Sequence, residues 1–279
     1  MSEILHVSDT ALMVAACRAM ETVRTDGLVN DPFAARLAGE RGMAIAQALP
    51  ILEAMCFGVG IRTRFLDELV MHEVTDLGVR TVVNLGAGLD TRPWRLALPA
   101  ELRWMEVDFP EMLEYKSGLL AGEQTTCRRE QMSADLADAS QRKAVFDAAG
   151  DGPGLVISEG LLMYLPEQVV TAIAASPGQN WHWVMDITSP EMARRTGTTG
   201  CDAIQKVRSE GHLNGEQILG VLQGSGWSRY RHKSYITDVW AAAPERIQAM
   251  SKMPAVTPES MAALPLDDPS GVTMFKRGA

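Results

Sequence analysis

The stretch from Thr81 to Thr91 constrains the fold more than any other part of the chain. It reads Thr-Val-Val-Asn-Leu-Gly-Ala-Gly-Leu-Asp-Thr, a short apolar run that ends in two glycines. Such a run is typical of a central strand in a parallel sheet, and Gly86 and Gly88 leave the backbone open to a ligand. A second strand-like run ends in Asp108, about 20 residues beyond Gly86, where a doubly wound sheet places the acid that binds a ribose. The sequence therefore predicts an α/β fold with one cofactor site at the ends of these two strands.

The residues after the glycines separate the two classes of cofactor that use such an acid. A dinucleotide site carries a third glycine before a long helix that receives the pyrophosphate, whereas this chain continues Leu-Asp-Thr-Arg-Pro. The carboxylate of Asp90 would also repel an anionic pyrophosphate. A ligand with an ammonium group, a sulfonium group and a ribose fits better, and S-adenosylmethionine is that ligand.

The composition is that of a globular chain and limits the classes of function. With 279 residues, of which 46% are hydrophobic and 22% charged, the chain is long enough to bury a full core, and we expect a single domain over 1–279. The net charge of -9 argues against a broad nucleic-acid footprint and against an anionic membrane surface. We therefore expect a small-molecule partner, with no nucleic acid and no membrane.

The cysteines and the start of the chain indicate a cytoplasmic protein without a metal site. The four cysteines form no C-x-x-C pair, so neither a zinc site nor a disulfide framework is expected, and we interpret them as buried thiols. The first residues lack a basic leader, which disfavours a signal peptide. No stretch approaches the roughly 18 uncharged apolar residues that would span a membrane.

Helical signals fill the chain before the first strand, so we expect an N-terminal helical cap over 1–78 and an α/β core over 79–279. Cap-type and helix-breaking residues divide this region. The expected helices run from about Thr10 to Gly27, from Pro32 to about Leu37, and from Met43 to Asp76 with breaks near Pro50 and around Gly58 to Gly60.

The core region alternates strand-like and helical runs, and its last two strands are expected to close the sheet in antiparallel fashion. Further strands are expected at 127–132, 181–187, 226–235 and 272–277, a strand together with its exit at 154–166, and helices at 110–120, 142–149 and 213–224. Glycine, threonine and charge replace apolar periodicity over 188–211. We expect this segment to form a lid over the edge of the sheet.

Several polar residues near these elements have two interpretations each. Arg62 is either a solvated arginine paired with an acid on its own helix or a ligand-binding group, and Arg18 has the same ambiguity. Asp135 either caps the next helix or accepts a hydrogen bond from an adenine amino group while Leu136 covers the ring. Glu159 follows a predicted strand at the edge where ligands bind, or is an ordinary exposed or capping acid.

Four motifs together resemble a known family. They are Asn-Leu-Gly-Ala-Gly-Leu-Asp-Thr-Arg (84–92), Glu-Val-Asp-Phe-Pro (106–110), Ser-Glu-Gly-Leu-Leu-Met-Tyr-Leu (158–165) and Arg-Thr-Arg-Phe-Leu-Asp (62–67). From about Thr10 to Tyr164, and more loosely beyond, the chain resembles the leucine carboxyl methyltransferase family, closest to its tetracenomycin-type polyketide O-methyltransferase branch. The resemblance implies a Rossmann-like class I S-adenosylmethionine-dependent methyltransferase fold. Such a fold has a mostly parallel seven-stranded sheet with an antiparallel closing strand.

The resemblance also implies how the cofactor would be held. Arg62 would pair with the methionyl carboxylate, with Arg18 as a helper from the first helix. Gly86 would lie along the methionyl backbone, and Asp108 would bind both ribose hydroxyls. Glu159 would face the amino-acid or sulfonium end of the cofactor.

The remaining roles implied by the resemblance concern adenine and the acceptor. Asp135 and Leu136 would hold the adenine, and Tyr164 would border the acceptor pocket. The segment 188–211 and the tail after Trp240 match no part of the family pattern, so the resemblance names no substrate.

These residues predict an O-methyltransferase that acts on a carboxyl or hydroxyl oxygen of a small metabolite, polyketide-like or another product of secondary metabolism. Alignment of nucleophile and methyl group can lower the barrier by about 7–11 kcal/mol, more than the roughly 10²- to 10⁴-fold rate factor of one general base. The alternatives are a protein C-terminal carboxyl methyltransferase, an NAD-dependent oxidoreductase, which the missing third glycine disfavours, and a non-catalytic cofactor-binding homologue.

The histidines favour an acceptor that needs no base. A carboxylate is already ionised at neutral pH, whereas a phenol is not and needs a base. None of the five histidines lies in a matched motif at the predicted sheet edge. His212, beside the expected lid, is the exception. The candidate catalytic residues are therefore His212 and, because it would border the acceptor pocket, Tyr164.

Overall fold

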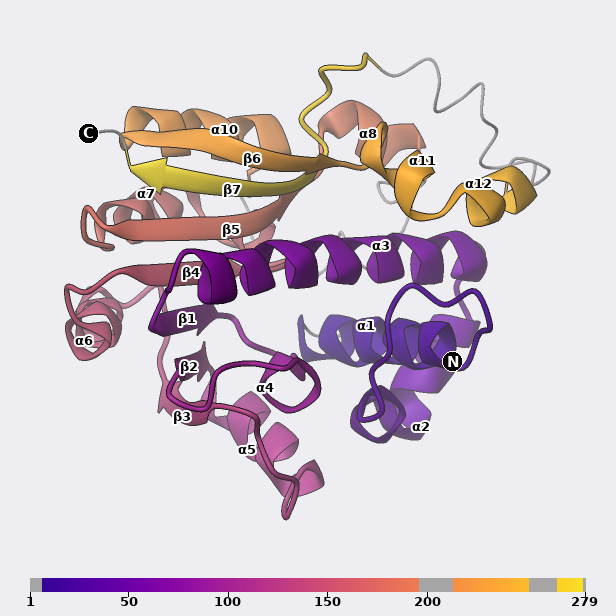
Figure 1. Ribbon diagram of the computed structural model, residues 1–279, viewed down its shortest axis with the longest axis horizontal. Coiled ribbons are helices and arrows are strands. Elements are labelled where there is room, and N and C mark those ends of the chain that lie inside the picture. Colours follow the sequence, from indigo (N-terminus) through magenta and orange to yellow (C-terminus); the bar gives the residue numbers. More distant parts are fainter. Residues whose placement is uncertain (1–6, 196–212, 251–264, 278–279) are drawn as a thin grey trace.

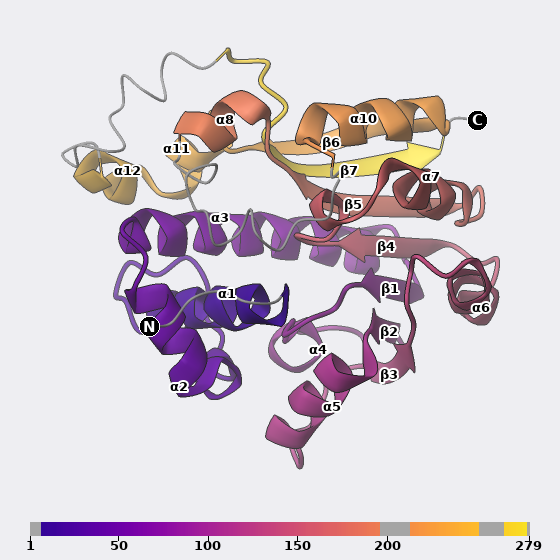
Figure 2. The ribbon, with the colours of Figure 1, turned by 180° about the vertical axis from the view of Figure 1, so that it is seen from behind.

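One twisted sheet forms the centre of the structure, a computed structural model that describes residues 7–195, 213–250 and 265–277 (Figures 1 and 2). Within these residues the sheet has seven strands in the order β3-β2-β1-β4-β5-β7-β6. The strands are β1 (Thr81–Leu85), β2 (Arg103–Asp108), β3 (Arg128–Ser133), β4 (Gly154–Ser158), β5 (Trp181–Ile187), β6 (Trp227–Ser234) and β7 (Gly271–Arg277). Strands β1 to β5 pair in parallel, and β7 runs antiparallel to both β5 and β6. The predicted Rossmann-like α/β fold, with its antiparallel closure, is confirmed.

Helices cover both faces of the sheet and extend beyond it. They are α1 (Val7–Thr22), α2 (Ala34–Gln47), α3 (Leu52–Met71), α4 (Arg92–Arg95), α5 (Pro110–Leu119), α6 (Ala139–Ala149), α7 (Glu167–Ala175), α8 (Pro190–Arg195), α10 (Gly215–Gly224), α11 (Asp238–Ala242) and α12 (Pro244–Met250). A π-helical turn, η1 (His72–Asp76), continues α3, and a short 3-10 turn, η2 (Leu162–Tyr164), follows β4.

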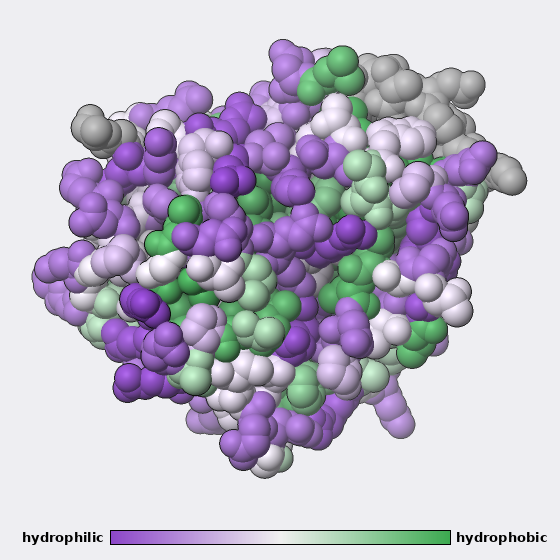
Figure 3. Space-filling view, viewed as in Figure 1, coloured by the Kyte–Doolittle hydropathy of each residue, from purple (hydrophilic) through white to green (hydrophobic). Residues whose placement is uncertain are grey.

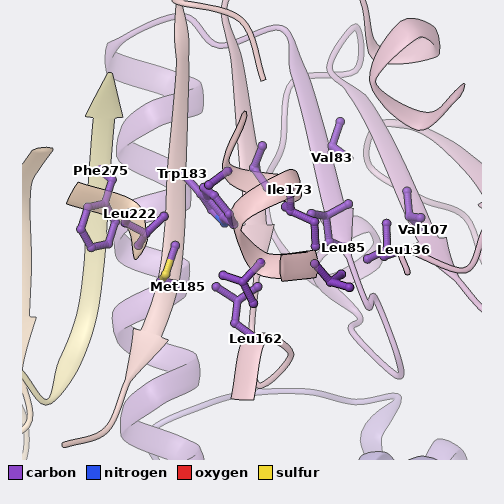
Figure 4. Packing of buried hydrophobic residues seen from close by; sticks show 14 of the residues in the cluster. Val83, Leu85, Val107, Leu136, Leu162, Ile173, Trp183, Met185, Leu222 and Phe275 are labelled. Carbon is purple, nitrogen blue, oxygen red and sulfur yellow. The ribbon is translucent and has the colours of Figure 1, made fainter. Parts of the chain in front are cut away.

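The apolar core has two layers because side chains alternate across each strand. On one face, side chains such as Val83, Trp183 and Phe275 meet Ile173 of α7 and Leu222 of α10 (Figure 4). On the other face, the sheet packs against α3, η1, α11 and α12. Hydrophilic residues cover most of the surface seen in Figure 3, with apolar residues gathered in small groups between them. The central strands are therefore shielded on both sides, as their apolar runs predict.

The N-terminal helices form a separate layer beside the sheet. α1 and α2 lie next to each other in both views and share an apolar cluster with Leu89 and Trp94, which follow β1 (Figures 1 and 2). α3 runs from this layer across the face of the sheet. The cap therefore sits against the segment that follows the predicted glycine turn, and α3 joins cap and core.

The predicted break at Gly58 to Gly60 is wrong. The break near Pro50 exists, because α2 ends at Gln47 and α3 begins at Leu52, but α3 then runs to Met71 without interruption. The helix has a glycine at position 60 because it passes close to a carboxylate there, which a side chain would crowd. A Cβ atom at Gly60 would lie 3.1 Å from Oε2 of Glu21, whereas one at Gly58 would meet nothing within 4 Å.

The predicted end of the second helix near Leu37 matches a break in the helical backbone at Gly39. Helix α2 starts at Ala34, close to the expected position, and continues to Gln47. Gly39 has a non-helical φ of 56° inside it, so the helix kinks there and resumes.

The expected lid over 188–211 is described only in its first part. Ser189 is buried and donates a hydrogen bond to Asp268 at 2.7 Å, and α8 packs Met192 against Ile236. The rest of the expected lid, and His212, lie outside the described residues. Among the described helices, none is long and apolar enough to cross a bilayer.

Candidate functional site

The predicted glycine turn and the predicted ribose acid form one unit in the structure. After β1 ends at Leu85, Gly86 and Gly88 have φ values of 61° and 43°, which glycine adopts without strain. The carboxylate of Asp108 accepts a hydrogen bond from the Gly88 amide at 2.6 Å and another from the Phe109 amide at 2.8 Å. Burial raises the pKa of Asp108, although both amides oppose the rise. The carboxylate holds the turn against β2 and keeps further lone pairs for a ligand.

Gly86 also has a packing role that the sequence does not reveal. A Cβ atom at this position would lie 2.8 Å from Cδ1 of Leu161, in the segment after β4. The chain segments that follow β1 and β4 therefore approach each other closely at the carboxyl edge of the sheet. Passage of the methionyl backbone along Gly86 stays a prediction.

A buried lysine supports the same turn. Lys116 of α5 is fully buried, with its Nζ 2.8 Å from a carboxylate oxygen of Glu106 in β2. Its Nζ also donates to the carbonyl of Asp90 at 3.3 Å. The other oxygen of Glu106 lies 2.7 Å from Arg129. Because a buried charge is tolerated only when it is paired and hydrogen-bonded, this network fixes the backbone after Gly88.

Arg92 is the centre of a second buried network. Its guanidinium lies 2.7 Å from Asp67 on α3, and 2.9 Å from both Asp90 and Glu159. Arg95 pairs with the same Asp67 at 2.5 Å. Burial raises the pKa of Asp90, but the charge and amide of Arg92 outweigh it and set the pKa at about 2. The network ties α3 to the segments after β1 and β4.

Arg62 reaches from α3 to the ends of two strands. Its Nε lies 2.9 Å from Oε1 of Glu159, and its Nη1 lies 3.4 Å from Oδ2 of Asp186. The other oxygen of Asp186 accepts from the Gly160 amide at 2.7 Å. Burial raises the pKa of Glu159, but Arg92 and Arg62 more than offset it, so the pKa is below its usual value. Arg62 is therefore not paired with an acid of its own helix, and it meets Glu159 as two predicted site residues would.

Arg18 forms no bond with Arg62 or Glu159 among those that the structure describes, and its partners lie elsewhere. It is buried on α1 and donates to Asp31 at 2.8 Å and to the carbonyl of Leu89 at 2.7 Å. Asp31 also accepts from Thr91 at 2.7 Å. The contact of Arg18 with Leu89 and the bond between Thr91 and Asp31 join the cap to the segment after the glycine turn. A direct contact between Arg18 and a cofactor stays a prediction.

The helix-capping interpretation of Asp135 is wrong. The cap of α6 is Asp138, whose carboxylate accepts from the amides of Ser140 and Gln141. Asp135 is exposed and accepts from the Ala137 amide at 2.9 Å. Leu136 is buried in the core. With the cap assigned to Asp138, Asp135 stays available for the predicted contact with adenine.

Of the two candidate catalytic residues, only Tyr164 is described. It ends η2, in the segment after β4, and is partly buried. Its place at the carboxyl edge agrees with the position expected for a residue that borders the acceptor. Its role stays a prediction.

Sequence reasoning missed two charged members of this site, Asp186 and Arg92. Asp186 lies in β5 one residue before its end, so an acid at the carboxyl end of a predicted buried strand was a usable signal. Arg92 lies inside the matched motif 84–92, but its partners come from distant parts of the chain. Only the fold brings these partners together.

Comparisons with known proteins agree with this architecture. The family model of leucine carboxyl methyltransferases matches residues 11–176. A Streptomyces coelicolor protein, named as a candidate S-adenosyl-L-methionine-dependent methyltransferase, is 40% identical over 247 residues, which cover 80% of this chain and 83% of that protein. A similarly named protein of Mycolicibacterium paratuberculosis is 38% identical over 255 residues, covering 79% and 83% of the two chains.

Solved structures share the fold at low sequence identity. A Thermobifida fusca protein described as a candidate methyltransferase has a TM-score of 0.59 at 17% identity, covering 100% of this chain and 97% of that one. A DUF574 family protein of Streptomyces avermitilis has a TM-score of 0.57 at 12% identity, covering 95% and 97%. Because the family match spans more than half of the sequence and includes the glycine turn, Asp108 and Glu159, this chain belongs to the leucine carboxyl methyltransferase family.

Proposed function

We propose that this protein is an S-adenosylmethionine-dependent O-methyltransferase that methylates a carboxyl or acidic hydroxyl oxygen of a small metabolite. The observation that carries the proposal is a row of ligand-type groups along the carboxyl edge of the sheet. Asp108 ends β2, the glycine turn follows β1, Glu159 follows β4 and Asp186 lies near the end of β5, in the spatial order β2-β1-β4-β5. Ligands of open α/β sheets bind at this edge.

The groups at this edge match the parts of S-adenosylmethionine, the cofactor that the relatives carry in their names. Arg62 presents guanidinium donors suited to the methionyl carboxylate. Glu159 and Asp186 are acceptors suited to the ammonium group, and Asp108 has lone pairs left for the ribose hydroxyls. Positive and negative groups therefore lie together where an amino-acid zwitterion would sit.

The adenine end follows from the strand order. Strand β3 lies next to β2 on the outer side of Asp108, and Asp135 and Leu136 come two and three residues after the end of β3. A ribose at Asp108 would thus direct the adenine toward these residues. We assign Asp135 to the adenine amino group and Leu136 to the ring.

The chemistry asks for alignment more than for proton transfer. When bound, S-adenosylmethionine supplies an electrophilic methyl group on its sulfonium. The protein groups would hold the cofactor at both ends, through Asp108 and Arg62, and thereby fix the line along which an acceptor oxygen must approach. Such positioning is worth up to about 7–11 kcal/mol of barrier. Tyr164 would border the acceptor on the side of β4.

The described histidines support an acceptor that is ionised without a base. His72 pairs with Asp76, His182 bonds to Glu73, and His232 bonds to Thr273, so none of these three is bonded to a charged group of the site. A carboxylate or an acidic hydroxyl needs no proton removal near neutral pH. The methylation rate should therefore change little from about pH 6.5 to pH 9, and His212→Ala should retain most of the activity.

The test is methyl transfer to an unknown acceptor. The protein would be incubated with S-adenosylmethionine carrying a labelled methyl group and with a bacterial metabolite extract, followed by mass spectrometry. We expect a labelled product that is heavier than a component of the extract by one CH2 unit. Asp108→Ala should abolish the product, and the product's ester or ether chemistry would identify the oxygen. Binding of the cofactor without any turnover would instead indicate a non-catalytic protein.

The pH dependence tests the acceptor class once a product is known. A rate that rises about tenfold per pH unit below the acceptor's pKa would mean that a neutral hydroxyl must first lose its proton. A large loss of activity in His212→Ala would mean that this histidine removes the proton. Either result would overturn the assignment of a base-free acceptor while leaving the methyl transfer itself intact.

A further inference from the structure

A tyrosine that follows the edge strand β6, Tyr235, lies near the same charged groups. Tyr235 is held by its backbone amide, which donates to the Ser270 carbonyl at 3.0 Å. Its ring stacks on Phe65 of α3, with ring centroids 6.3 Å apart and planes 13° from parallel. Phe65 lies one helical turn beyond Arg62. The ring is therefore fixed between α3 and the sheet, close to the arginine.

The hydroxyl of Tyr235 is buried and lacks a hydrogen-bond partner among the described residues. Other described tyrosines differ, because Tyr115 donates to the Leu37 carbonyl and Tyr230 donates to Glu73. Burying a hydroxyl without a partner destabilises a fold, so such a group calls for an explanation such as a ligand.

The charged groups of the candidate site act electrostatically on this hydroxyl. Burial raises the pKa of Tyr235 well above its usual value, and the nearby charges of Asp186 and Glu159 raise it further, against Arg62. The hydroxyl therefore stays protonated at any working pH and is available as a neutral donor. Burial lowers the pKa of Arg62, and Tyr235 is in turn among the groups that raise it, so the two groups lie within electrostatic range of each other.

We propose that the Tyr235 hydroxyl donates a hydrogen bond to the carboxylate of the methionyl group and, with Arg62, forms the two donors of that subsite. The inference rests on the proposed function, because it takes S-adenosylmethionine as the ligand. An incoming carboxylate meets two acids here, Glu159 and Asp186, and one guanidinium already shared between them. A second, uncharged donor offsets this repulsion without adding another group that the acids would neutralise.

The test removes one oxygen atom from the protein and one carboxylate from the ligand. Tyr235→Phe keeps the ring on Phe65, and calorimetry would measure its affinity for S-adenosylmethionine and for decarboxylated S-adenosylmethionine, which keeps the ammonium and the sulfonium. We expect binding of the intact cofactor to weaken about 10- to 100-fold, the range for a lost hydrogen bond to a charged group. Affinity for the decarboxylated form should stay within about twofold of wild type, because the partner of the hydroxyl is missing.

Tyr230→Phe is the matched control because its hydroxyl is bonded to Glu73, away from the site. It should lower the melting temperature and leave both affinities unchanged. Tyr235→Phe should leave the melting temperature of the ligand-free protein equal or higher, since no internal hydrogen bond is lost. Equal affinity of Tyr235→Phe and wild type for the intact cofactor would overturn the proposal. So would an equal loss for both ligands. Failure of the wild type to bind either ligand would instead overturn the proposed function.

Discussion

Several charged side chains at this site are buried and paired with side chains of opposite charge. Arg92 is 1% exposed and yet touches three carboxylates, from Asp67, Asp90 and Glu159. A guanidinium tolerates this because it always keeps its charge and presents several donors in one plane. Such a network stabilises the fold only while every member stays ionised, so its acids should make stability depend on pH.

Asp90→Asn should make the free energy of unfolding depend less on pH in the acid range. The folded pKa of about 2 lies below the ordinary 3.8, so the ionised carboxylate contributes stability above about pH 4 that is lost as the pH falls toward 2. That contribution is roughly 2 kcal/mol. Urea unfolding should show a gap between wild type and variant at pH 6 that narrows toward pH 2. Asp147→Asn, which alters an exposed pair with Lys143, should show almost no gap at either pH.

Among the elements, α3 does most to connect the parts of the molecule. It carries Arg62 and Asp67 toward the site and packs Phe65 and Leu66 on the sheet. Its N-terminal half also lies against Glu21 of α1, whose carboxylate is bound by Arg246 of α12 through two nitrogens at 3.0 and 3.1 Å. The close approach of helix and carboxylate requires a residue without a side chain.

Two glycines of α3 should respond oppositely to the same substitution. Gly58→Ala meets nothing within 4 Å and should stabilise the protein by up to about 1 kcal/mol through helix propensity. Gly60→Ala places a methyl group 3.1 Å from atoms of the buried Glu21 and should destabilise it by about 1–3 kcal/mol. Thermal or urea unfolding measures the change in the free energy of unfolding for both variants. A gain in both would show that the Glu21 pair moves aside freely.

At the scale of the whole molecule, the N-terminal helices and the sheet contribute different halves of the candidate site. Arg62 comes from these helices and Asp108 from the sheet, and α3 joins the two through packing on both faces. A ligand bound by both halves favours the fully assembled state over any state in which they have separated. Its effect should therefore appear as a shift of one unfolding transition.

S-adenosylhomocysteine should raise the melting temperature of the wild type as a single transition. At about 100 times its dissociation constant it adds about 2.7 kcal/mol, or about 5 °C for a chain of this size. In Asp108→Ala the shift should nearly vanish, because two hydrogen bonds to a charged group are lost, each worth about 1.5–3 kcal/mol. The shift is compared, not the melting temperature itself, because Asp108 also holds the Gly88 amide. An unchanged shift would remove Asp108 from the ribose site.

The sheet was predictable because its strands are buried on both faces and appear as apolar runs between turns. The expected strand at 181–187 has the same bounds as β5, and those at 127–132, 226–235 and 272–277 differ from the observed strands by one residue at one or both ends. The helix break at Gly58 to Gly60 was predicted wrongly because glycine has two uses, and contact with Glu21 is invisible in the local sequence. The spacing of apolar residues predicts which face of an element is buried, but it does not predict which distant residue packs against that face.

The same limit applies to the site. Asp108 and the glycine turn were predictable because their spacing is set by one strand, one turn and the next strand. The partners of Arg62, in contrast, lie 97 and 124 residues away, at Glu159 and Asp186. The unpaired hydroxyl of Tyr235 has no sequence signature at all, because it depends on what the fold leaves without a partner.

The position of β7 has a consequence for how the protein is made. Although β7 follows β6 in the chain, it lies between β5 and β6 in the sheet. Until residues 271–277 have left the ribosome, β6 has no neighbour to pair with, and Tyr235 has no fixed place beside α3. A chain that is still being synthesised can assemble β1 to β5, but its edge at β5 stays exposed. Completion of the sheet is then a late, long-range step, of the kind that slows folding.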